Sequence, residues 1–97
     1  MTDNELLNQV KNALNITGTF QDNTLTVYIN EVKGFMKSAG IPQSVIDSEA
    51  SVGCIARGVS DLWNFGAGGG KLSDYFRLRM LQLRIDTSDI EEGEGNG

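Results

Sequence analysis

Histidine is absent from this chain, and cysteine and proline each occur only once. A single cysteine excludes a disulfide within the chain, and the lack of histidine excludes a Cys/His metal site and the most common general base. No apolar run approaches the roughly 20 residues that cross a bilayer, so we expect no membrane-spanning helix. Residues 1–5 are polar and acidic, unlike a secretory signal. We therefore predict a protein of the reducing cytosol.

The net charge of −5 is unevenly placed along the chain. Residues 86–97 contain five acids and no base, whereas residues 1–85 contain eight acids and all eight bases. The first 85 residues are therefore neutral. A polar, Gly-rich segment of like charge buries too little surface to offset its ordering entropy. We therefore predict a helical domain over 1–85 and a flexible acidic tail over 86–97, disordered in the isolated subunit.

Apolar residues at helical spacing predict the first two helices. Thr2 and Glu5 form a capping-box pattern at the start of the first helix, and residues 15–18 end it. The second helix has the clearest apolar stripe, from Leu25 to Ala39, which outweighs a brief strand-like alternation over 24–29. Gly40 fits the position just after its end. The cap at its start is predicted among three neighbours: Asp22, Asn23 and Thr24.

Two further helices complete the predicted fold, which is all-α, a small bundle of four helices. The third helix is predicted to start near Ser48, or one turn earlier at Ser44. Two glycines inside it, Gly53 and Gly58, indicate close approach of a neighbouring helix. Cys54 and Trp63 are interpreted as core residues of this helix. Ser73 can cap the fourth helix.

A glycine-rich segment separates the third helix from the fourth. It invites comparison with a phosphate-binding P-loop, which has Gly, four residues and then Gly-Lys-Ser/Thr between a strand and a helix. Here Phe65 stands in place of the first glycine, Leu72 replaces the hydroxyl residue, and a helix precedes the segment. We interpret it as an interhelical loop, whose characteristic residues are Gly66, Gly68, Gly69, Gly70 and Lys71.

No arrangement of side chains predicts catalysis. Two carboxylate pairs can be considered for acid–base chemistry: Asp47 with Glu49, and Asp61 with Asp74. Eight acids balanced by eight bases in residues 1–85 are more typical of a solvated surface. We therefore predict that the protein is not an enzyme and holds no cofactor or metal.

The fourth helix is apolar on more than one side and also contains three arginines, a pattern that favours a subunit interface. Its cations could pair with Asp61, with Glu49 or with the tail of a neighbouring subunit. The alternative is a small helical DNA-binding regulator, but three arginines without a lysine run form a weak basic face. The candidate interface residues are Arg77, Arg79, Arg84, Tyr75, Phe76 and Leu81.

Residues 57–76 carry a family resemblance. The run Asp61-Leu62-Trp63-Asn64, the glycine-rich loop and the helix after it resemble the head–tail connector proteins of tailed bacteriophages, also called head-completion or DNA-packaging proteins. The resemblance extends over about residues 5–85, since the order and ends of the predicted helices also fit.

The resemblance implies a structural role without catalytic residues. Members of that family form homo-oligomeric rings, typically dodecamers, beneath the phage portal protein. The ring extends the DNA channel and gives a stopper or tail-completion protein a docking surface. DNA passes through without sequence-specific binding, which suits a neutral domain, because a basic channel would hold the duplex through its phosphates. The expected location is the head–tail interface of the virion, after assembly in the bacterial host cytoplasm.

Overall fold

The computed structural model describes the backbone of residues 1–65 and 74–96 and the side chains of residues 1–64, 74 and 76–86. Helices and short connections account for this part of the chain, and no strand occurs in it. The predicted all-α fold is therefore confirmed. The elements in chain order are α1 Asp3–Ala13, α2 Asp22–Ser38, α3 Gln43–Ile46, a 3-10 turn Glu49–Ser51, α4 Val52–Phe65 and α5 Asp74–Asn96.

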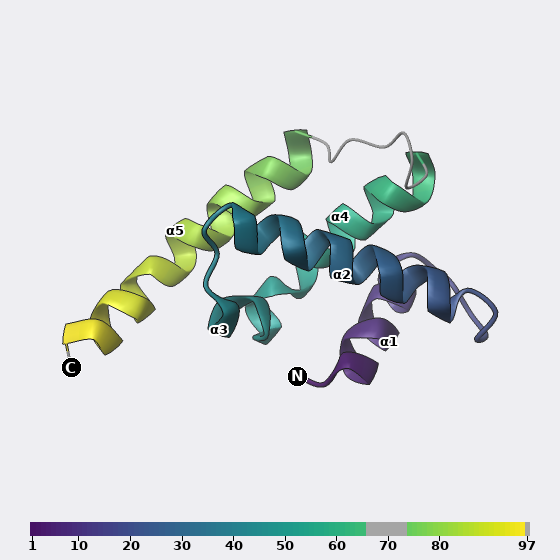
Figure 1. Cartoon of the computed structure of the whole chain (residues 1–97), viewed down its shortest axis with the longest axis horizontal. Coiled ribbons are helices and arrows are strands. Elements are labelled where there is room, and N and C mark those ends of the chain that lie inside the picture. The colour runs from purple at the N-terminus through teal and green to yellow at the C-terminus, as the bar shows by residue number, and fades with distance from the viewer. Residues whose placement is uncertain (66–73, 97) are drawn as a thin grey trace.

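Helix α4 is the centre of the bundle and packs against α1, α2 and α5. Figure 1 shows α2 lying across α4, while α5 extends away from the body toward one end of the molecule. The molecule is therefore elongated, with extents of 46 × 26 × 18 Å. The four longer helices match the predicted bundle, and α3 adds a single turn between α2 and α4.

The ends of α1 agree with the sequence patterns. The Thr2 hydroxyl accepts a hydrogen bond from the Glu5 N–H at 3.1 Å, and the Glu5 side chain accepts one from the Thr2 N–H at 3.4 Å. This is the predicted capping box. At the other end Asn15 has φ +60°, and the N–H of Ile16 donates to the carbonyl of Lys11 at 2.9 Å, as in a Schellman motif.

Helix α2 ends as predicted but starts differently. Gly40 has φ +94°, a conformation that favours glycine, and the Ile41 N–H donates to the Met36 carbonyl at 3.0 Å. Gln21 occupies the N-cap and makes no side-chain capping bond, so the predicted cap at 22–24 is wrong. The Asp22 carboxylate instead pairs with the ammonium group of Lys11 at 2.7 Å.

The third predicted helix begins later than expected. Ser48 precedes the 3-10 turn with extended backbone angles, and α4 starts only at Val52. The buried Ser51 hydroxyl donates to the carbonyls of Ile46 and Ser48, at 2.6 and 2.9 Å. These bonds connect α3 with the 3-10 turn, and the two remain separate elements before α4. A start at Ser44 or Ser48 would require one continuous helix through this region.

Gly58 lies where α2, α4 and α5 meet. A Cβ atom at Gly58 would lie 2.8 Å from both γ carbons of Val32 and 2.9 Å from the ring of Phe76. Gly53, one and a half turns earlier, leaves room for the guanidinium group of Arg79. Close helix approach is thus confirmed at Gly58, whereas at Gly53 the neighbour is the end of the Arg79 side chain. The buried apolar core contains Leu6, Val10, Leu25, Ile29, Val32, Met36, Ile41, Val45, Ile46, Cys54, Ile55, Val59, Leu62, Phe76 and Leu83.

The last helix does not end at residue 85, where the sequence predicted the start of the tail. Helix α5 continues to Asn96, and the division into a helical domain over 1–85 and an acidic tail over 86–97 stays a prediction. No proline occurs after residue 85 to stop the helix. The Gln82 amide donates to the Asp86 carboxylate at 2.8 Å, an i,i+4 contact that spans the predicted boundary.

Candidate subunit interface

Helix α5 presents apolar side chains on two opposite faces. On the inner face Phe76 is fully buried and Leu83 is buried against the rest of the bundle. On the other face three side chains remain exposed, at 63, 51 and 57% of their surface. They are spaced three and four residues apart and so lie on one side of the helix. We call them the outer stripe: Leu78, Leu81 and Ile85.

Phe76 was predicted at the subunit interface, and the structure corrects this assignment. Its side chain has no exposed surface. The ring packs edge-on against Phe35, with centroids 5.7 Å apart, and lies against Gly58. Phe76 therefore belongs to the core of its own chain. Leu81 is exposed as an interface residue must be, and the side chain of Tyr75 lies outside the described residues.

Two of the predicted arginines border the outer stripe. The guanidinium carbon of Arg77 lies 5.6 Å from the centroid of the Phe35 ring, a cation–π contact with α2. Arg84 follows two turns later, is exposed, and makes no ion pair within the described part of the chain. Arg77 is thus partly engaged by its own chain, whereas Arg84 is available to a neighbour.

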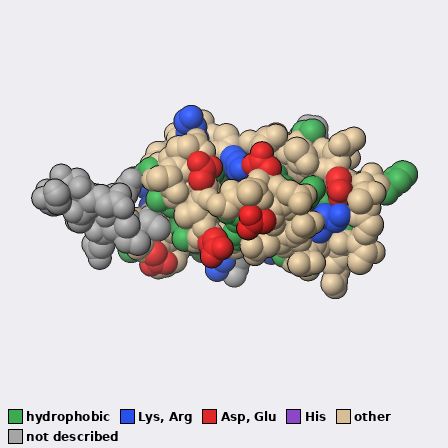
Figure 2. Space-filling model, turned by 90° about the horizontal axis from the view of Figure 1, so that it is seen from below, with side chains coloured by type: hydrophobic (Ala, Val, Ile, Leu, Met, Phe, Trp, Pro, Cys, Tyr) green, Lys and Arg blue, Asp and Glu red, His purple; other side chains and the backbone are tan. Residues whose placement is uncertain are grey.

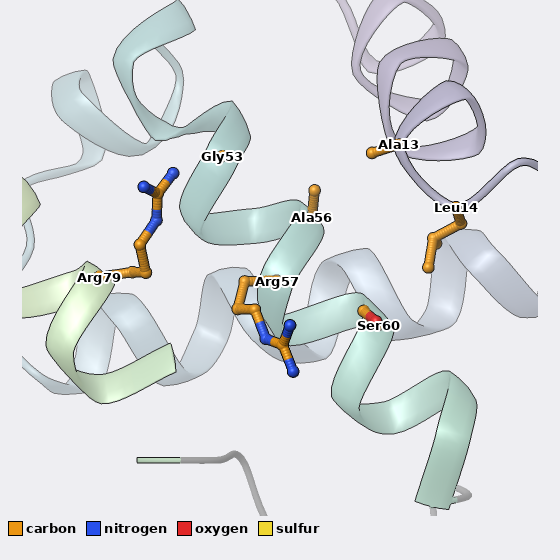
Figure 3. Close-up of a pocket in the computed structure, with 7 residues that line it drawn as sticks. All are labelled: Ala13, Leu14, Gly53, Ala56, Arg57, Ser60 and Arg79. Carbon is orange, nitrogen blue, oxygen red and sulfur yellow. The ribbon is translucent and has the colours of Figure 1, made fainter. Parts of the chain in front are cut away.

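Arg79 contributes to a pocket between α1, α4 and α5. Figure 3 shows its side chain reaching from α5 toward Gly53, whereas the side chain of Arg57 points away from Gly53. The two guanidinium groups therefore do not converge on a common point, and that of Arg79 lies against Gly53 of α4. The pocket has a volume of about 340 Å³ and is lined by Ala13, Leu14, Gly53, Ala56, Arg57, Ser60 and Arg79.

Asp61 was considered as a partner for a neighbour's arginine, and its burial excludes this role. Only 1% of its surface is exposed, and Arg57 Nη2 lies 3.0 Å from its carboxylate. The four-residue spacing of this pair on one helix is a signal that sequence reasoning missed. Glu49, the other proposed partner, is exposed and forms no ion pair among the described residues.

Cys54 and Trp63 have structural surroundings, as predicted. The Cys54 thiol is free and buried, and desolvation raises its pKa from 9.0 to about 11, partly offset by the nearby charge of Arg79. A thiol with so high a pKa is a poor nucleophile near neutral pH. Trp63 packs edge-on against Tyr28, with ring centroids 6.4 Å apart.

Two exposed apolar residues outside α5 were not predicted as site residues. Phe20, in the loop before α2, is 94% exposed, and Val27 is exposed on α2 itself. Lys11 of α1 holds the middle and the end of this loop, because its ammonium group donates to the Gly18 carbonyl and pairs with Asp22. The only available sequence signal was an aromatic residue in a polar loop.

On the face shown in Figure 2, acidic and basic side chains of the described residues are interspersed, and neither sign forms a single patch. Among the described residues, no three or more acidic or cysteine side chains group as metal ligands, and no helix is long and apolar enough to cross a membrane. The predicted loop residues 66–71 lie outside the described part of the chain.

Comparisons of the chain with protein-family models, curated proteins and solved structures found no match. The function must therefore be inferred from the residues and their geometry. What they define is a small helical domain in which one helix exposes apolar side chains beside Arg84, an arginine that forms no ion pair with the residues that the structure describes.

Proposed function

We propose that this chain is a structural subunit of a phage head–tail connector, which assembles into a ring beneath the portal and extends the DNA channel. The observation that carries the proposal is the outer stripe of α5. Its three large side chains are more than half exposed, although the inner face of the same helix already supplies the core. Contiguous exposed apolar surface of this kind marks a protein–protein contact.

The resemblance of residues 57–76 to connector proteins is the reason for proposing a head–tail connector as the assembly. Within that run, Asp61 is held by Arg57 and Trp63 packs against Tyr28 of the same chain. These residues therefore organise the domain from within. The outer stripe of α5 is then the surface available for contact with a neighbouring subunit or with the portal.

The arginines fit a passive channel component better than a DNA-binding regulator. A regulator needs a coherent basic face. Here Arg77 lies over Phe35, and Arg79 lies against Gly53. Their guanidinium groups are thus partly used within the chain. A neutral domain over 1–85 also lets DNA slide, since few phosphates would be held.

Native mass spectrometry of the chain, alone and mixed with the portal protein encoded in the same genome, tests the proposal. We expect ring-sized homo-oligomers that bind the portal, and we expect the protein in purified virions. The double variant Leu78→Ser/Leu81→Ser should lose this assembly and keep its helix content. Asn12→Ser, an exposed substitution on α1 and so on a different helix, is the control. Absence of rings at every concentration together with no portal binding would contradict the proposal.

A further inference from the structure

The exposed large apolar side chains belong to two segments of the chain, the start of α2 with the loop before it, and α5. Among residues whose side chains the structure describes, and apart from the N-terminal Met1, they are Phe20, Val27 and the outer stripe. Phe20 lies in the loop that enters α2, and Val27 lies in the second turn of that helix. In Figure 1 this loop is at one end of the molecule, and α5 runs toward the opposite end.

Each group has a charge of opposite sign beside it. Glu31 is four residues after Val27 and therefore its neighbour on α2, while Arg84 is three residues after Leu81 on α5. Both side chains are exposed, and neither forms an ion pair within the described part of the chain. We call Phe20, Val27 and Glu31 the α2 patch.

We propose that the outer stripe of one copy docks on the α2 patch of a second copy, with Glu31 of one copy paired to Arg84 of the other. This inference rests on the proposed function and names the counter-surface within the ring. Apolar surface meets apolar surface, and the two unpaired charges are complementary. Phe20 is 94% exposed, and phenylalanine is among the residue types enriched at protein–protein interfaces.

The pairing is heterologous, because two different surfaces of the same chain meet. Such contacts generate closed rings when the rotation between copies closes. A symmetric antiparallel pairing of two outer stripes is less favourable. It would bring the edge carrying Arg77 and Arg84 against the same edge of the partner, so like charges would face each other.

Gly34 adds independent support on the α2 side. It lies seven residues after Val27 and three after Glu31, on the same side of α2. It is exposed, and a Cβ atom there would meet nothing within 4 Å. A glycine inside a helix is unfavourable, and at Gly34 no packing against the described residues explains it. A second copy approaching α2 closely would explain it.

Charge reversal on the full chain tests the pairing through sedimentation velocity at low and high salt. We expect Glu31→Arg and Arg84→Glu each to weaken self-association about tenfold, and the double variant to restore most of it. Glu49→Arg and Lys37→Glu introduce the same charge changes elsewhere and should have little effect. Loss in either single variant without recovery in the double variant would overturn the pairing of Glu31 with Arg84.

Cysteine trapping identifies the surfaces that meet. A Val27→Cys chain and a Leu81→Cys chain are oxidised separately and as a mixture. We expect a cross-linked dimer only in the mixture, since each contact needs one surface of each kind. The buried native Cys54 should not contribute.

The same experiment separates failure of this inference from failure of the proposed function. Cross-linking of Leu81→Cys chains with themselves, or no cross-link in a mixture that still forms portal-bound rings, would overturn the α2 patch as the counter-surface and leave the connector proposal standing. A chain that neither cross-links, self-associates nor binds portal would overturn both. Phe20→Ser should weaken assembly at least tenfold with unchanged helix content.

Discussion

The two faces of α5 have similar side chains and opposite surroundings. Phe76 and Leu83 on the inner face are buried, whereas Leu78 and Leu81 on the other face are more than half exposed. Burial of apolar surface stabilises a fold by about 25 cal/mol per Å². Within the isolated chain, only the inner face gains this stabilisation. Apolar composition alone therefore does not decide which face of a helix enters the core.

The contacts with α4 decide which face of α5 is buried. Helix α4 carries glycines at positions 53 and 58, and α5 places Arg79 against the first and Phe76 against the second. Phe76 and Arg79 are one turn apart on the same side of α5, so these two contacts lie on the face that α5 turns toward α4. The outer stripe is then turned away from α4, toward solvent or a partner.

The largest expected difference between the two faces of α5 is in the effect of replacing one leucine on each face. Leu83→Ala on the inner face removes buried side-chain volume and should lower the free energy of unfolding by about 2–5 kcal/mol. Leu81→Ala, two residues away and half exposed, should change it by less than about 0.5 kcal/mol. Urea denaturation followed by circular dichroism, at a concentration where the chain is monomeric, measures both. Equal losses would show that α5 has no distinct inner face.

Cys54 reports whether the seam between α4 and α5 is closed. Burial raises the pKa of its thiol from 9.0 to about 11, so at pH 9 the folded chain should have about 50-fold less thiolate than the unfolded chain. Alkylation by iodoacetamide at pH 9 should be slower by at least that factor without denaturant. Between pH 9 and 11 the folded state retains a proton that the unfolded state releases, so stability should fall as the pH rises. Equally rapid alkylation of native and denatured chain would mean that the seam is open.

Glycine-to-alanine substitutions at Gly58 and Gly34 should change the free energy of unfolding in opposite directions. At Gly58 the new Cβ atom would lie under 3 Å from Val32 and Phe76, and overpacking of this kind costs about 1–3 kcal/mol. At Gly34 the Cβ atom meets nothing within 4 Å, so Gly34→Ala should stabilise the isolated chain by about 0.5–1 kcal/mol. Thermal denaturation of monomeric protein distinguishes them. A loss of stability at Gly34 would indicate an intrachain contact at that position.

Local rules predicted the ends of several elements. The capping box at Thr2, the turn at Gly40 and the close approach at Gly58 depend on patterns that are short in sequence. The start of α4 at Val52 was not predicted, because the two turns before it depend on hydrogen bonds of the Ser51 side chain that spacing does not reveal. The acidic composition of residues 86–97 predicts a tail but does not fix the last residue of α5, since no proline there marks a helix end.

The candidate interface was harder to predict than the fold. Helical spacing showed that α5 was apolar on two sides, but it could not assign Phe76 to the core or Leu78 to the surface, since that depends on where α4 lies. Arg77 and Arg79 were recognised as a cationic cluster. Their contacts with Phe35 and Gly53 depend on tertiary structure, which spacing along α5 does not specify.

The smallest expected difference separates two arginines that border the outer stripe. Arg77→Ala removes a cation–π contact with Phe35 and should lower the free energy of unfolding by about 0.5–1 kcal/mol. Arg84→Ala removes no ion pair within the described chain and should leave stability unchanged to within about 0.3 kcal/mol. In self-association the order should reverse, because Arg84 has its charge available for a second copy. Denaturation of the monomer and sedimentation of the assembly together test this reversal. If Arg77→Ala weakened assembly more than Arg84→Ala did, the cation that contacts the second copy would lie at position 77 instead.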